Sequence, residues 1–238
     1  MEDPTRWFSP EELKEMSRPT MDRAIEALDR GDLAEARRLC EGMKYEWRFM
    51  HDLLVDSVAG LLTFVKERLG EDAVADAHRS SMERRWKHQV GAVDRQERRE
   101  IVHALAATWR AHSGSGTGPS PGAFTISEDD EKFTFTMNPC GSGQRLWRMG
   151  RYRGEDAYAL TDRAHDWSYD RVGFPIYCTH CPFMNEILPI EWLGYPLYPS
   201  DPPEDFDRDP CVWYWYKDPT TIPDRHYTRY GLRRQRPS

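Results

Sequence analysis

A short segment at positions 113–122 divides the chain into two parts with different hydrophobic periodicity. It reads Ser-Gly-Ser-Gly-Thr-Gly-Pro-Ser-Pro-Gly, a composition typical of flexible connections. Before this segment, apolar residues recur with the spacing of α-helices, whereas after it they alternate as in β-strands. The sequence therefore predicts a helical bundle over 1–112, a linker over 113–122 and an α+β domain over 123–238.

Local start and stop signals define the helices of the first part. Ser9, Pro10 and the acidic residues after them predict a helix start, because they provide a cap, a fixed φ angle and charges that suit the helix dipole. Further helices are predicted over 20–29, 32–69, 72–88 and 94–112, with Gly31 and Gly70 as stops. The longest helix carries an apolar set at helical spacing: Trp47, Met50, Leu54, Val58, Leu61, Leu62 and Val65. We expect an antiparallel bundle.

The second part shows strand signals. Two alternating segments, 124–126 and 133–137, flank an acidic turn and predict a β-hairpin that leads the chain to Cys140. Residues 195–198 and 212–216 are rich in aromatic and β-branched side chains and predict two more strands. A short helix is expected over 183–192. The predicted fold class is α+β, with an N-terminal helical bundle followed by a small antiparallel-sheet domain that contains a cysteine centre.

Composition restricts the class of protein. Hydrophobic residues make up 39% of the chain, and nine Trp, eleven Tyr and nine Phe supply bulk for a core. The net charge of −7 argues against general nucleic-acid binding. With no long apolar run and an acidic N-terminus, we expect no membrane span and a cytoplasmic location. In that compartment cysteines are expected as reduced thiols or ligands rather than disulfides.

Four of the five cysteines follow the linker and are the main candidate site. Cys178 and Cys181 have the Cys-x-x-Cys spacing that lets two sulfurs face one ion, while Cys140 and Cys211 each follow a proline. These four residues are the predicted ligands of zinc, in either a closed structural site or an open catalytic one. An iron–sulfur cluster and a set of free thiols packed in an aromatic core are the alternatives.

Two residues beside the cysteine pair are candidates for proton transfer. His180 lies between Cys178 and Cys181, and we favour an acid–base role over metal ligation because a tight turn would aim it away from a shared ion. Glu186 follows closely and is a candidate general acid or base. The Asn138–Gly143 loop around Cys140 can be a nest of backbone N–H groups or a plain glycine turn.

The helical part contributes one further candidate pair. His51 and Asp52 lie in the most apolar helix, where Arg48 is a local partner for Asp52. A buried histidine is usually a hydrogen-bonded core residue. The functional alternative is that His51 acts as a base, with Asp52 fixing its tautomer, close to the cysteine centre. Cys40, in the same helix, is expected in the core.

The segment from Cys178 to Phe183, with Glu186, Leu188-Pro189 and Cys211, resembles the cysteine-bearing part of L-2-amino-thiazoline-4-carboxylic acid hydrolases. Some relatives of that family are 4-vinyl reductase-like ligand-binding domains. The resemblance covers about the last third of the chain and implies cytosolic chemistry on a small sulfur- or nitrogen-containing molecule.

Taken together, these features predict a cytoplasmic, metal-dependent enzyme that acts on a small-molecule substrate by hydrolysis or lyase chemistry. The alternatives are a ligand-binding module with a structural four-cysteine zinc site and an iron–sulfur redox protein. The oligomeric state does not follow from the sequence.

Overall fold

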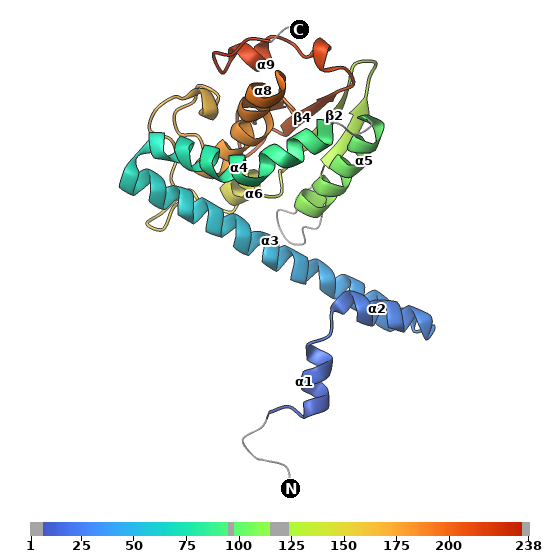
Figure 1. Ribbon diagram of the computed structural model, residues 1–238. Coiled ribbons are helices and arrows are strands. Elements are labelled where there is room, and N and C mark those ends of the chain that lie inside the picture. Colours follow the sequence, from blue (N-terminus) through green and yellow to red (C-terminus); the bar gives the residue numbers. More distant parts are fainter. Residues whose placement is uncertain (1–6, 95–97, 115–123, 235–238) are drawn as a thin grey trace. The chain divides into compact units, whose positions relative to one another are not determined.

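The computed structural model describes residues 7–94, 98–114 and 124–234 (Figure 1). The chain forms two compact units, Met1–Met50 and His51–Ser238, which are described separately. Within the described ranges, no helix combines the length and the apolar character needed to cross a membrane.

The first unit is helical. It contains α1 (Pro10–Met16), α2 (Thr20–Asp29) and the first half of α3 (Leu33–Leu69). Ser9 and Glu12 form the reciprocal capping box expected at the start of α1. Four apolar side chains of α2 and α3 are buried: Ala24, Ala27, Ala36 and Leu39. Cys40 is exposed, so its predicted place in the core is wrong.

In the second unit, the remainder of α3 is followed by α4 (Glu71–Asp94), α5 (Arg98–Trp109) and a π-helical turn, η1 (Arg110–Gly114). On α3, Val55, Ala59 and Leu62 are buried, whereas Leu54 and Leu61 from the predicted apolar set are exposed. This half of α3 therefore buries only part of the apolar residues that the sequence pattern assigns to it.

Helices α4 and α5 share a core with the sheet instead of packing only on other helices. One cluster combines Val90, Ile101, Leu105 and Trp109 of the helices with Phe135, Met137, Trp213 and Trp215 of the strands. We expected a bundle that ends before the linker, but the compact unit begins at His51 and includes both kinds of element. Burial of the apolar faces of α4 and α5 against aromatic strands accounts for this arrangement.

The sheet has four antiparallel strands in the order β1-β2-β4-β3. They are β1 (Phe124–Glu128), β2 (Lys132–Met137), β3 (Ser200–Asp201) and β4 (Cys211–Tyr216). The β1–β2 hairpin and the aromatic strand β4 confirm the sequence predictions. Residues 195–198 do not form the predicted strand. The N–H groups of Leu197 and Tyr198 donate to the carbonyl of Asn185 instead of to a neighbouring strand.

Short helical segments surround this sheet. They are α6 (Gly143–Arg148), the 3-10 turn η2 (Asp166–Ser168), η3 (Ile176–Thr179), α7 (His180–Pro182), the π-helical η4 (Phe183–Ile187), α8 (Leu188–Leu193), η5 (Pro219–Thr221) and α9 (Arg225–Thr228). Cys178 and Cys181 thus lie on consecutive helical turns. Pro189 lies in the first turn of α8, a position that tolerates proline.

Candidate functional site

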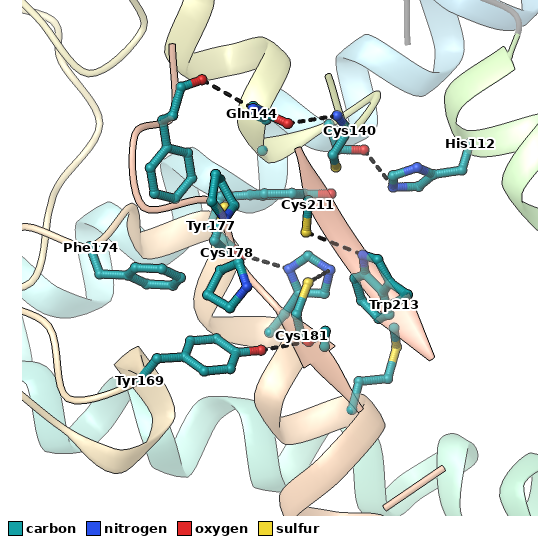
Figure 2. Close-up of a pocket in the computed structure, with 18 of the residues that line it drawn as sticks. His112, Cys140, Gln144, Tyr169, Phe174, Tyr177, Cys178, Cys181, Cys211 and Trp213 are labelled. Atoms are coloured by element: carbon teal, nitrogen blue, oxygen red, sulfur yellow. Dashed lines mark hydrogen bonds between the residues drawn. The ribbon is translucent and has the colours of Figure 1, made fainter. Parts of the chain in front are cut away.

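The four cysteines that follow the linker line one cavity of about 250 Å³. Cys140 and Cys211 come together because β2 and β4 pair with Met137 opposite Cys211. Cys178 and Cys181 enter the cavity from η3 and α7. Figure 2 shows these side chains gathered between the rings of Tyr169 and Phe174 on one side and Trp213 on the other. Residues far apart in sequence therefore form one thiol-lined site.

The remaining wall is mostly aromatic or apolar, with a few polar groups. Its large side chains are Trp109, Tyr169, Phe174, Tyr177, Met184, Phe206 and Trp213. The polar side chains His112, Ser142, Gln144, His180 and Ser200 also line it. A concave, largely apolar space with a small number of polar groups is the usual form of a small-molecule site.

The cavity thiols are held in the neutral form. Burial raises the pKa of Cys178 and Cys181 well above the ordinary thiol value, and neighbouring thiols raise it further. Burial is also the main cause of the raised pKa values of Cys140 and Cys211. A thiolate in this cavity therefore needs a base or a cation to stabilise it.

Two of the sulfurs receive hydrogen bonds from N–H groups. The backbone N–H groups of Ser142, Gly143 and Gln144 bond to Cys140 and partly offset the rise in its pKa. The indole Nε1 of Trp213 donates to Cys211 Sγ at 3.2 Å. The loop around Cys140 thus supplies the nest of N–H groups considered above, and the acceptor of these N–H groups is the sulfur of the loop's own cysteine.

Cys181 and His180 form a direct pair. Nδ1 of His180 lies 2.5 Å from the carbonyl oxygen of Tyr177, which can only accept, so Nδ1 carries the proton. Nε2 is then unprotonated and lies 3.5 Å from Cys181 Sγ, whose S–H donates to it. Burial lowers the pKa of His180, which keeps the ring neutral. His180 therefore lines the cavity with an unprotonated nitrogen, Nε2, that can accept the proton of the neighbouring thiol.

A close backbone approach keeps Cys178 in place. A Cβ added at Gly143 would lie 2.3 Å from Cys178 Sγ and 3.2 Å from Cδ1 of Tyr177. Only glycine allows the first turn of α6 to pass so near this sulfur.

His51 and Asp52 are linked to the cavity through Ser142. Nδ1 of His51 lies 3.1 Å from Asp52 Oδ1, and Nε2 lies 3.0 Å from Ser142 Oγ. Asp52 forms an ion pair with the buried Arg145 of α6. The imidazole of His112 lies 2.7 Å from the same Ser142 oxygen. The sequence analysis singled out neither Ser142 nor His112; the only local signal is a serine between two glycines.

Glu186 belongs to a buried network beside the cavity. Its carboxylate forms an ion pair with Arg229 and accepts hydrogen bonds from Ser200 Oγ at 2.9 Å and Tyr169 Oη at 3.2 Å. Burial raises the pKa of Glu186, and Arg229 opposes that rise. Because Ser200 and Tyr169 line the cavity, Glu186 orients part of its wall.

The predicted metal centre remains a prediction. Across residues 7–94, 98–114 and 124–234, no group of three or more His, Cys, Asp or Glu side chains is placed to hold a metal ion. The four cysteines share the wall of one cavity without forming such a group among the described residues.

Comparison with protein families, with curated proteins and with solved structures gives no match for this chain. The function must therefore be inferred from the geometry of the cavity.

Proposed function

We propose that the cavity is the active site of an enzyme that hydrolyses a small, largely apolar molecule, with Cys181 as nucleophile and His180 as base. The observation that carries this proposal is the meeting of four cysteines from three separate segments of the chain, together with His180, in one cavity of about 250 Å³. Its volume suits a small molecule rather than a peptide or a nucleic acid. A reducing, cytoplasmic environment that keeps the thiols free is part of the proposal.

The Cys181–His180 geometry gives a complete proton balance. Sγ of Cys181 attacks an acyl carbon while its proton moves to Nε2 of His180, 3.5 Å away. The imidazolium then protonates the departing group, and water releases the acid from the resulting thioester. The Tyr177 carbonyl keeps Nδ1 protonated throughout, so Nε2 remains the position that exchanges the proton.

The test is hydrolysis of a panel of small apolar esters, thioesters and amides, with intact-mass detection of an acyl adduct. We expect turnover of at least one compound and an adduct on Cys181. Cys181→Ala should lose turnover, with a decrease on the order of a thousandfold or more, because the nucleophile is removed.

Cys40→Ala is the matched control, because Cys40 is exposed and lies in the other unit. It should keep full activity. Turnover that survives Cys181→Ala, or a panel that yields neither turnover nor adduct, contradicts the proposal.

A zinc-thiolate centre is the second candidate. Two observations favour it. N–H groups donate to the sulfurs of Cys140 and Cys211, and such donors stabilise thiolates. The cavity cysteines also repel one another when they are ionised, and a cation bound between the thiolates would offset this repulsion. Metal analysis of the purified protein tests it. Bound zinc that is lost in Cys178→Ser and kept in Cys40→Ser supports this candidate, visible absorbance indicates an iron–sulfur cluster, and metal-free protein with titratable thiols excludes both.

A further inference from the structure

We propose that Ser142 is a second nucleophile of the cavity, with His51 as its general base and Asp52 as the residue that positions His51. The compounds it would take are small acyl or phosphoryl electrophiles. The inference goes beyond the proposed function because it requires none of the cysteines.

Hydrogen-bond directions in the chain Asp52–His51–Ser142 assign each proton. The carboxylate of Asp52 can only accept, so Nδ1 of His51, at 3.1 Å, carries the proton. The neutral ring then presents a bare Nε2 to Ser142 Oγ at 3.0 Å, and the serine hydroxyl donates to it. This is the order of contacts by which a carboxylate, an imidazole and a hydroxyl activate the hydroxyl oxygen.

Neighbouring charges keep the Asp52 carboxylate oriented and the His51 ring neutral. Arg145 binds both carboxylate oxygens of Asp52 and is itself only 3% exposed, so the carboxylate is held in one orientation. Burial and the charge of Arg145 lower the pKa of His51, which keeps the ring available as a proton acceptor. His112, 2.7 Å from Ser142 Oγ, must donate to that oxygen because the hydroxyl proton points to His51.

Access to a ligand comes from the cavity. Ser142 lines it although the residue is only 1% exposed, so a molecule inside the cavity can reach an oxygen shielded from bulk water. Because the surrounding wall is largely aromatic, the ligand should carry a compact apolar group next to its electrophilic atom.

Diisopropyl fluorophosphate is a suitable probe because it is small, apolar and reacts with activated serine hydroxyls. In the labelling step the Ser142 Oγ–P bond forms as the P–F bond breaks. The hydroxyl proton moves to Nε2 of His51, and the electron pair of the broken bond leaves with fluoride.

A second serine provides an internal control within the same protein. Ser200 also lines the cavity, but its hydroxyl donates to the carboxylate of Glu186 at 2.9 Å and lies 2.7 Å from the Tyr169 hydroxyl. Within the described residues, the side-chain partners of the Ser200 hydroxyl are a carboxylate and a phenol, whereas the Ser142 hydroxyl contacts two imidazoles. Both serines see the same probe concentration, but only Ser142 should react.

The experiment is treatment of the intact chain with this probe, followed by intact-mass measurement and peptide mapping. We expect one diisopropylphosphoryl group on Ser142 and none on Ser200. His51→Gln should slow the labelling on the order of a hundredfold, since the general base is lost. Peptide mapping reads the label on Ser142 separately from any adduct on Cys181, which separates this result from any failure of the thiol mechanism. Cys40→Ala, at an exposed position in the other unit, should label at the unchanged rate. Absence of label on Ser142, label on Ser200, or an unchanged rate in His51→Gln would overturn the proposal.

Discussion

Gly143 determines how closely the α6 turn can approach the thiols. A methyl group at this position would lie 2.3 Å from Cys178 Sγ, so the sulfur, the ring of Tyr177 or the turn itself must shift. Overpacking of this kind typically costs about 1–3 kcal/mol. We therefore predict that Gly143→Ala lowers the free energy of unfolding by about that amount, as measured by urea denaturation.

Gly42 is the matched control for this substitution. It lies within α3, and apart from its chain neighbours and the adjacent backbone of the same helix, no atom of the described residues is within 4 Å of the Cβ that alanine would add. Gly42→Ala should raise stability by up to about 1 kcal/mol through helix propensity alone. Equal effects of the two substitutions would show that the contact with Cys178 carries no strain.

The residues of the cavity show which parts of a site can be predicted from the sequence. Cys178, His180 and Cys181 are neighbours in the chain, so their association follows from spacing alone. Ser142 meets His51 across 91 positions, and that contact depends on how α6 packs against α3. No local pattern encodes such a contact. The proximity of these three residues was therefore predictable, whereas the partner of His51 was not.

At the scale of elements, α6 is joined to α3 by an ion pair between the buried Arg145 and the partly buried Asp52. Arg145 donates to Asp52 and, through Nε, to the carbonyl of Gly141 at 2.8 Å. We predict that Arg145→Ala destabilises the fold by about 2–3 kcal/mol, because the Gly141 carbonyl and the partly buried carboxylate each lose the hydrogen bonds that Arg145 donates. Because the substitution also removes the ion pair that orients Asp52, the labelling of Ser142 should slow.

Arg151 gives the comparison. It pairs with Asp56 on α3, but the Arg151 side chain is 47% exposed, so water screens the interaction. Arg151→Ala should cost at most about 1 kcal/mol. If thermal melts show the two arginine variants to be equally stable, burial does not strengthen the Arg145–Asp52 pair.

Elements with strong local signals were predicted well, and those set by packing were not. The caps and stops around α1, α2 and α3 are properties of a few neighbouring residues, and the helices begin and end close to the predicted places. The segment 195–198 has the composition of a strand, yet two of its N–H groups bond to Asn185 instead of to a neighbouring strand. Composition cannot specify which acceptor lies nearby.

For the second unit as a whole, buried neutral histidines connect stability to pH. Burial lowers the pKa values of His78, His112 and His226 to about 3, from an ordinary value of 6.5. Below pH 6.5 these histidines bind protons in the unfolded chain but stay neutral in the folded chain. Folding therefore becomes less favourable as the pH falls. Glu186 acts in the opposite direction, because its raised pKa lets the folded form bind a proton first.

We therefore predict that the free energy of unfolding falls between pH 6.5 and pH 5, by at most about 1.4 kcal/mol per pH unit for each of these histidines. Most carboxylates stay ionised in this window, so the histidines dominate the slope. Urea denaturation at intervals of half a pH unit measures it. His78→Gln keeps a donor for Thr179 Oγ1, which lies 2.9 Å from Nε2 of the ring, but glutamine cannot take up a proton. The decrease of the unfolding free energy per pH unit should therefore be smaller in this variant by the contribution of one histidine. If His78→Gln keeps the wild-type slope, His78 does not contribute to the pH dependence, and a flat profile in the wild-type protein would show that these rings are not held neutral by the fold.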